Sequence, residues 1–295
     1  MVKIHDYPCR YDSGSGLGLS DKDLDRFPFP DSYLKMEPMA DLARAVRIGR
    51  GMAVSVLPFC HTLEAEALGA NILPGNRRCT PRAGRPCLLS AEELFRLPAL
   101  DLDTPRLRET LAACRLLKDR GEPVLFQISG PLTIFNSLLS TDLLFFTLQK
   151  QYDAMTKLFC RTGRDLIRLM EAALDSGADL ISYADPMNSV GILGPKLTEK
   201  ISRDFTAPFL SDANRALDRE ALILLCPKTA LALTGSGLAE WTPHPLPSSC
   251  AYDRAALKLK GKVRFGGQAC VKTRTVSDVF QELILRNITD QEEPI

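Results

Sequence analysis

The sequence predicts an α/β protein of the TIM-type (β/α)8 barrel class, and three observations lead to that prediction. Short apolar runs alternate with amphipathic helical segments from about residue 50 to the end, as in βαβ units of a parallel sheet. The runs are apolar throughout, as barrel strands buried on both faces are. No glycine-rich turn follows the first run, where PFCHTLEAEALG stands, so a doubly wound open sheet is the weaker alternative.

The strands are predicted from short runs rich in apolar and β-branched residues. They are expected at 53–59, 123–131, 178–186, 221–227, 238–244 and 263–268. Roughly six or seven strands can be recognised rather than eight. The usual eighth strand is therefore degenerate, missing, or supplied by the N-terminal arm.

The helices are predicted from apolar residues at helical spacing and from their end signals. Ser90 and Glu93 form a capping-box pattern, Pro105 lies in a first helical turn, and Gly121 and Gly177 follow the ends of long helices. Helices are expected at 39–50, 61–70, 90–97, 104–121, 131–140, 153–177, 197–220, 229–235, 252–261 and 276–287.

The domain organisation is predicted to be simple. Residues 1–50 are expected to form an irregular N-terminal arm, and residues 51–295 a single barrel domain. The GSGLG stretch at 14–18 has no strand before it, so it is interpreted as a surface loop. Trp241 and the PHPLP stretch after it are expected to form a loop over the barrel mouth.

The composition of the chain argues against nucleic-acid binding, membrane insertion and a secreted disulfide-bonded protein. The 295 residues carry a formal net charge of +1, which gives no electrostatic footprint for nucleic acid or an anionic membrane. The opening residues carry early charges and no long apolar stretch, and no window is long enough for a membrane span. Nine cysteines at scattered spacings do not form a disulfide framework, so a cytoplasmic protein with reduced thiols is expected.

Two thiols and one imidazole follow the ends of different predicted strands. Cys226 ends the run ALILLC, Cys270 ends KVRFGGQAC, and His61 ends GMAVSVLPFCH. Strand ends of a parallel barrel converge on one mouth, and thiolates with an imidazole suit a catalytic zinc ion. Either cysteine alone would be interpreted as a buried packing residue, and only the two together favour a metal site.

Several strand-end segments, in this order, resemble the uroporphyrinogen decarboxylase superfamily, and within it the cobalamin (corrinoid)-dependent methyltransferases. The segments are LPFCHTLEAEALGA (57–70), FQISGPLTIF (126–135), GADLISYADP (177–186), ILGPK (192–196), LILLCPKTALAL (222–233) and FGGQAC (265–270). The resemblance covers about residues 50–275 and implies a TIM-type barrel. It also implies a zinc-dependent methyltransferase that moves a methyl group between a corrinoid protein and a thiol, a folate or a methylated compound.

The resemblance implies a zinc motif His-x-Cys with a distant Cys, and this chain departs from it because Leu224 stands where the His would be. The expected metal ligands are Cys226, Cys270 and, as third ligand, His61, with Glu64 and then Asp185 as the other choices. His61 and Glu64 are three residues apart and expected on one helical face.

Further roles follow for the same residues. Asp185 and Glu64 are the expected catalytic residues, and Gln268, Asp185 and His61 the expected substrate contacts. Methylcobalamin would arrive on a separate corrinoid protein, because the chain lacks a corrinoid-binding Asp-x-His-x-x-Gly motif.

Two other functions stay open. One is a metal-free lyase of the decarboxylase type acting on a tetrapyrrole, although the first strand ends in Pro58-Phe59-Cys60-His61 without the arginine that grips carboxylates. The other is a non-catalytic barrel that binds a corrinoid protein, which the missing histidine favours.

Overall fold

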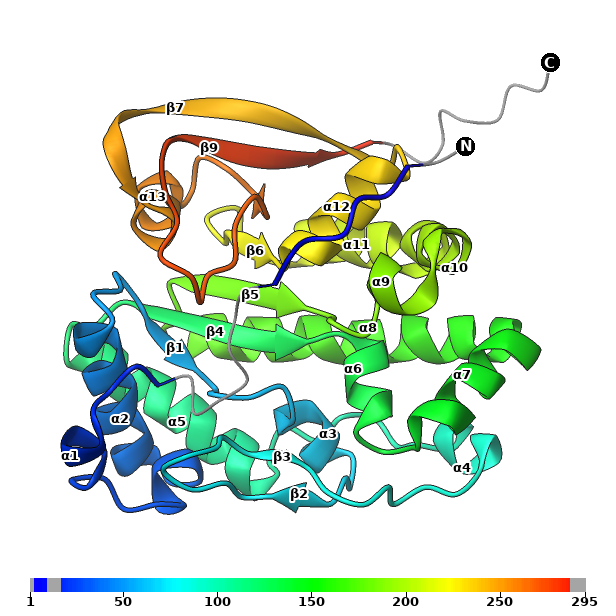
Figure 1. Ribbon diagram of the computed structural model, residues 1–295, viewed down its shortest axis with the longest axis horizontal. Helices are drawn as coiled ribbons and strands as arrows, with labels where there is room; N and C mark the ends of the chain where they lie inside the picture. The colour runs from blue at the N-terminus through cyan, green and yellow to red at the C-terminus, as the bar shows by residue number, and fades with distance from the viewer. Residues whose placement is uncertain (1–2, 10–16, 287–295) are drawn as a thin grey trace.

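The computed structural model describes residues 3–9 and 17–286. Within this part of the chain, seven strands form one sheet in the order β1-β4-β5-β6-β8-β9-β7 (Figure 1). Their bounds are β1 Ser55–Leu57, β4 Val124–Ser129, β5 Leu180–Ala184, β6 Ile223–Leu225, β8 Phe265–Gly266, β9 Val276–Leu285 and β7 Ala239–Ala251. Strands β1, β4, β5, β6 and β8 are parallel. This is the TIM-type arrangement that the sequence predicts. A separate two-stranded sheet pairs β2 (Ile72–Leu73) with β3 (Arg82–Ala83).

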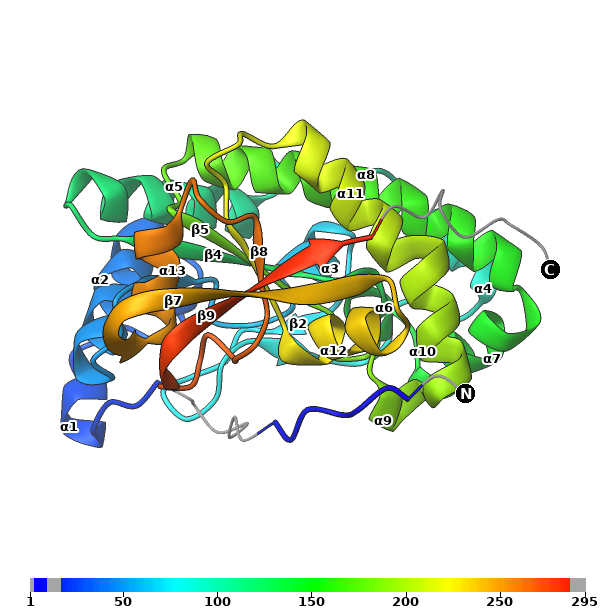
Figure 2. The same ribbon diagram turned by 90° about the horizontal axis from the view of Figure 1, so that it is seen from above.

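Helices connect the strands and cover the sheet. Figure 2 shows α5, α8 and α11 lying along one side of it. The helical elements are α1 Asp21–Leu24, η1 Asp31–Tyr33, α2 Met36–Gly49, α3 Leu63–Ala67, α4 Ala91–Phe95, α5 Pro105–Asp119, α6 Pro131–Asn136, α7 Thr141–Lys150, α8 Tyr152–Asp175, α9 Val190–Leu193, α10 Pro195–Ile201, the π-helical turn η2 Ser202–Thr206, α11 Ala207–Ala216, α12 Pro227–Gly235 and α13 Tyr252–Leu259.

The central strands are buried along their whole length. Every residue of β4, β5 and β6 is buried, because helices pack on the sheet and leave no face to solvent. Phe126, Ile181, Ile223 and Phe265 lie next to one another in the register of these strands and belong to the main core. The continuous apolar runs of the sequence follow directly from this burial.

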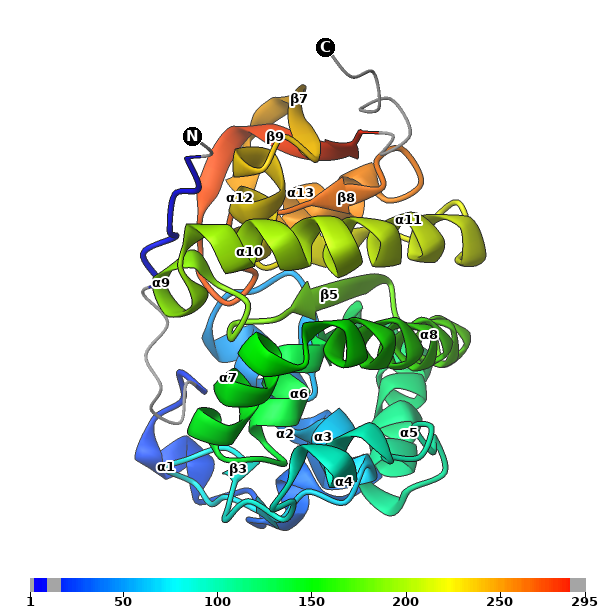
Figure 3. The same cartoon turned by 90° about the vertical axis from the view of Figure 1, so that its right-hand side faces the viewer.

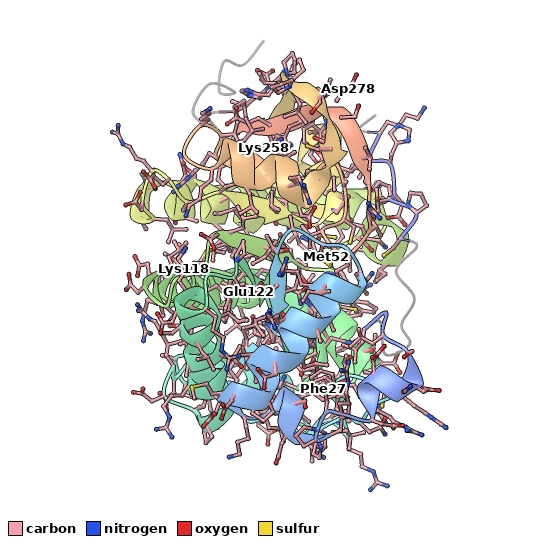
Figure 4. The ribbon with its side chains drawn as sticks, turned by 90° about the vertical axis from the view of Figure 1, so that its left-hand side faces the viewer. Phe27, Met52, Lys118, Glu122, Lys258 and Asp278 are labelled. Carbon is pink, nitrogen blue, oxygen red and sulfur yellow. The ribbon has the colours of Figure 1, made fainter. Side chains whose placement is uncertain are left out.

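The helix predicted at 39–50, within the range of the N-terminal arm, is present as α2. Helix α2 packs against α5 and β1. Its Arg44 and Arg47 form ion pairs of 2.9 and 2.6 Å with Glu122, which follows α5 and lies beside α2 in Figure 4. These charge pairs hold α2 at the edge of the sheet where β1 lies.

The predicted last helix is wrong, because residues 276–285 form strand β9. Apolar residues at 276, 279, 280, 283 and 284 match helical spacing, but the segment pairs antiparallel with β7 from Ala239↔Leu285 to Ala251↔Val276. A long neighbouring strand supplies partners for the backbone groups of β9, and its β-branched residues fit a strand well. Tertiary pairing therefore overrides the local periodicity.

The strand predicted at 238–244 is present and extends to Ala251 as β7, so the loop predicted at Trp241 and PHPLP is wrong. Pro243 and Pro245 face Gln281 and Val279 of β9. Strand β7 is the edge of the sheet, and proline, which has no N–H to donate, is tolerated there.

Strand β8 is the point where the parallel series ends. Gly266 pairs in parallel with Leu224 of β6 and antiparallel with Glu282 of β9. Figure 3 shows β8 and the β7–β9 ribbon stacked beyond α11 and β5. The degenerate end of the barrel is therefore a two-stranded antiparallel ribbon that continues the sheet.

Most other predicted elements are present with shorter bounds. The capping box of Ser90 and Glu93 is formed at α4, and the predicted helix 197–220 is interrupted by the π-helical turn η2. Helix α7 and the β2–β3 pair were not predicted. Residues 14–16 of the GSGLG stretch lie outside the described residues. No described helix has both the length and the apolar character that a membrane crossing needs.

Candidate functional site

One cavity of about 200 Å³ lies at the carboxyl ends of the five parallel strands. Its lining comes from every one of them: His61 follows β1, Gln127 lies on β4, Ser182 on β5, Cys226 follows β6 and Cys270 follows β8. The complete lining is Cys9, His61, Gln127, Ser182, Ala184, Pro186, Leu225, Cys226, Pro227, Cys270, Val271 and Lys272. This is the position at which barrels of this class carry out chemistry.

The strand register explains why these residues meet. Gln127 pairs with Ser182, and Ser182 with Leu224, so all three lie at one level of the sheet. The amide of Cys226 donates to the Tyr183 carbonyl at 2.8 Å, which places Cys226 just beyond this level, at the start of α12. The predicted convergence of His61, Cys226 and Cys270 on one pocket is thus what the structure shows.

His61 is held in one orientation by its neighbours. The side-chain nitrogen of Gln127 donates to the Cys60 carbonyl at 3.2 Å and lies 3.3 Å from His61 Nδ1. The carbonyl fixes the amide so that its second N–H faces Nδ1, which therefore accepts. Burial, and then the charge of Lys272, lower the pKa of His61 well below its usual range. The ring is neutral at pH 7 and carries its proton on Nε2.

The two thiols are protonated in this setting. Burial raises the pKa of Cys226 to about 11, and burial also raises the pKa of Cys270. Lys272, two residues after Cys270, lines the same cavity and interacts electrostatically with Cys270, Cys60 and Cys226; burial is the largest cause that lowers its pKa. The Lys272 side chain therefore lies among the thiols.

Asp185 lies outside the cavity lining although its neighbours Ala184 and Pro186 belong to it. Its carboxylate accepts hydrogen bonds from the first turn of α6: from Thr133 N at 2.9 Å, Thr133 Oγ1 at 2.6 Å and Leu132 N at 3.2 Å. A Cβ on Gly130 would lie 2.3 Å from the Asp185 side chain, so only glycine allows this approach. The structure gives Asp185 the role of a buried cap on α6.

The side chains of Glu64 and Gln268 also lie outside the lining of the barrel-mouth cavity. Glu64 accepts from Ser129 N at 2.7 Å and lines a separate small cavity with Arg161, and His61 precedes α3 rather than sharing a helical face with Glu64. Gln268 donates to the Val279 carbonyl at 2.9 Å and accepts from Gln281 N, so its amide is used on β9. The structure does not bring either residue to the thiols.

The described residues are not grouped as a zinc site in this structure. The donor atoms are of the right kind, but no three or more His, Cys, Asp or Glu side chains of residues 3–9 and 17–286 are grouped as metal ligands. The Gln127 side-chain nitrogen lies 3.3 Å from His61 Nδ1, which leaves Nε2 as the ring nitrogen for a ligand, and the Lys272 side chain lines the cavity with the thiols.

Four cavity residues with polar side chains were not predicted from the sequence. Lys272 could have been considered, because it follows Cys270 at a strand end. Gln127 and Ser182 lie inside apolar strands, and their inward direction depends on register. Cys9 lies in a segment with no predicted structure, so no pattern in the sequence points to it.

Another cavity, of about 500 Å³, is an open groove between α1 and α2. It is lined by charged and apolar side chains such as Arg26, Asp41 and Ile48, and it contains no thiol or imidazole. The barrel-mouth cavity is therefore the candidate active site.

The chain belongs to the uroporphyrinogen decarboxylase (URO-D) family, whose model matches residues 5–232. Methylcobamide:CoM methyltransferase MtbA of Methanosarcina mazei is 27% identical over 70% of this chain and 61% of its own length. MtaA of Methanosarcina barkeri is 24% identical over 63% of this chain and 56% of its own length. The chain thus spans about three fifths of these relatives.

The fold has a counterpart among solved structures. A methyltransferase from Methanosarcina mazei superposes with a TM-score of 0.61 at 23% identity, over 72% of this chain and 63% of its own. Family and superposition together confirm the predicted TIM-type barrel. The predicted resemblance to the methyltransferase branch of the superfamily is confirmed by the named relatives.

Proposed function

We propose that this chain is a corrinoid-dependent methyltransferase whose reaction takes place in the barrel-mouth cavity. The observation that carries the proposal is the convergence of His61, Cys226, Cys270 and Lys272 on one cavity in a chain similar to methylcobamide:CoM methyltransferases. The substrates we propose are a methylcobamide on a separate corrinoid protein and a small thiol such as CoM.

The cavity volume favours a small acceptor. At about 200 Å³ it lies below the ~300–1,000 Å³ typical of pockets for drug-sized ligands. A corrin ring is too large to enter, so the methylcobamide would dock outside with only its methyl group at the mouth. The acceptor sulfur forms a bond to the methyl carbon, the methyl–cobalt bonding pair stays with cobalt, and the thiol proton is released to solvent.

The residues of the cavity have distinct parts in this proposal. The Lys272 ammonium stabilises the negative charge on the acceptor sulfur, because an ion pair is stronger in a cavity with little water. His61 Nε2–H donates a hydrogen bond to the bound acceptor. Cys226 and Cys270 flank the reacting sulfur with polarisable, uncharged side chains.

Zinc binding at this cavity stays a prediction of the sequence. The positions of His61 and Lys272 do not favour zinc, and elemental analysis of the purified chain tests for the metal directly. The alternative of tetrapyrrole decarboxylation is the less favoured one, since among residues 3–9 and 17–286 the lining of the cavity includes no arginine to hold carboxylates.

The test is methyl transfer from methylcobalamin to CoM without oxygen, followed by the loss of the methylcobalamin spectrum. We expect turnover by the native chain, and Lys272→Met should slow it about a hundredfold, as loss of a charge-stabilising group does elsewhere. Cys226→Ser/Cys270→Ser should slow transfer by about tenfold. Cys160→Ser on the exposed face of α8 is the matched control and should transfer at the native rate.

Two outcomes contradict the proposal. No transfer by the native chain to CoM or to dithiothreitol, with either methylcobalamin or a methylated corrinoid protein as donor, would favour the non-catalytic barrel. Native rates in Lys272→Met and the double cysteine variant would place the reaction outside this cavity.

A further inference from the structure

The N-terminal segment crosses the molecule far from its sequence neighbours. In Figures 1 and 2 the blue residues near the N-terminus run beside α12 and pass close to α9. Asp6 lies 3.6 Å from Lys228 of α12, and Cys9 at the end of the segment lines the barrel-mouth cavity. Residues 3–9 thus extend from the far end of α12 to the mouth. We call them the N-terminal strap.

Two glycines form the seat of the strap. A Cβ on Gly235, the last residue of α12, would lie 2.9 Å from Ile4 Cα and 3.1 Å from the Lys3 carbonyl oxygen. A Cβ on Gly191 of α9 would lie 2.5 Å from Asp6 Oδ2. Both positions are helical, where alanine would otherwise be favoured by about 1 kcal/mol. At Gly235 the strap backbone therefore lies closer to α12 than a side chain there would permit, whereas at Gly191 the close contact is with the end of the Asp6 side chain.

The strap also closes one side of the cavity. Cys9 is exposed on one side and lines the cavity on the other, and its thiol interacts electrostatically with both Cys226 and Cys270. Most of the strap is exposed, with only Ile4 and Tyr7 half-buried. A segment with so few buried contacts opens at low cost compared with the core.

We propose that the N-terminal strap is a removable cover of the candidate active site, seated on Gly191 and Gly235, with Cys9 as its contribution to the cavity wall. When closed, the strap encloses a cavity that fits only a small acceptor. When open, it exposes Cys226 and Cys270 to a bulky methyl donor. The role assigned to opening depends on the proposed function; the cover itself does not.

Alkylation of the cysteines by N-ethylmaleimide in the native full-length chain tests the cover. Peptide mass spectrometry gives a separate rate for each cysteine. We expect Cys226 and Cys270 to react slowly in the native chain. In Gly235→Ala both rates should rise about tenfold, because the new methyl group displaces the Ile4 backbone and opens the strap locally.

The other cysteines serve as internal references. Cys160 is exposed and should react at one rate in every variant, whereas Cys114 is fully buried on α5 and reacts only if the protein unfolds. If Cys114 becomes reactive in Gly235→Ala, that variant is unfolded and Ile4→Asp is used in its place. Ile4→Asp changes the strap and leaves the core unaltered. Ile4→Asp should raise the same two rates.

Unchanged rates at Cys226 and Cys270 in a folded Gly235→Ala chain and in Ile4→Asp would overturn the proposal. The result is independent of methyl transfer: a chain with no transferase activity can still show the cover. If the chain transfers methyl groups but Cys226 and Cys270 react equally fast in all variants, the result supports the proposed function and contradicts the proposed cover.

Discussion

Asp185 shows at the scale of single residues how a strand-end carboxylate can serve structure instead of catalysis. Its oxygens accept from the first turn of α6, and burial nevertheless raises its pKa to about 6. Burial outweighs the hydrogen bonds because a buried carboxylate loses hydration that they only partly replace. The protonated form is therefore favoured in the folded chain more than in the unfolded one.

This shift predicts a pH dependence of stability. The folded chain binds the Asp185 proton up to about pH 6, whereas the unfolded chain releases it near 4, so ionisation costs stability as pH rises between these values. Relative to Asp185→Asn, the free energy of unfolding of the native chain should fall by about 2 kcal/mol from pH 4 to pH 7. Urea unfolding at both pH values measures it, and a difference that stays constant or grows with pH contradicts the assignment.

His61 and Lys272 line the predicted metal site together with the two thiols. The residue types at three strand ends were correct for zinc, but protonation and neighbours decide what such residues do. The Gln127 amide assigns the His61 proton to Nε2, and Lys272 supplies the positive charge. The polar character of the site is thus set by residues that carry no motif.

Strand β9 is the element whose structure depends most on its partner. Its backbone pairs with β7 over most of its length and with β8 at one residue, and Gln268 binds its Val279 carbonyl and Gln281 amide. Phe280 is fully buried and stacks on Tyr252 of α13. Pairing, the Gln268 side chain and one aromatic anchor replace the helix that the periodicity favours.

Removing the Gln268 amide should loosen this element. Gln268→Ala leaves two backbone groups of β9 without that partner, which should cost about 1–3 kcal/mol in the free energy of unfolding. Hydrogen exchange should quicken at the Gln281 amide more than at the amides of β4. Gln151→Ala, on a helix cap away from β9, is the matched control. Equal protection at Gln281 in the variant and the native chain argues against this role.

The zinc content of the whole chain can be measured directly. Protein purified without oxygen and offered zinc should contain much less than one zinc per chain, because His61 and Lys272 do not form a metal pocket with the thiols. Elemental analysis of the native chain and of Cys226→Ala/Cys270→Ala tests this expectation. About one zinc per native chain that is lost in the double variant would reverse it and restore the ligand set expected from the sequence.

The sequence by itself determined the barrel class, the family resemblance and the positions of the five parallel strands along the chain. These properties depend on local patterns: apolar runs between amphipathic helices, capping residues, and thiols and an imidazole that follow strands. It also indicated that His61, Cys226 and Cys270 share one mouth, because parallel strands place their carboxyl ends together.

Only the tertiary structure decided the rest. Residues 276–285 form strand β9 because β7 pairs with them. The side chains of Asp185 and Gln268 form hydrogen bonds with backbone groups of α6 and β9. Lys272 and Cys9 joined the cavity through contacts between segments far apart in the chain. Such contacts depend on packing and hydrogen bonding in three dimensions, which no spacing along a single sequence encodes.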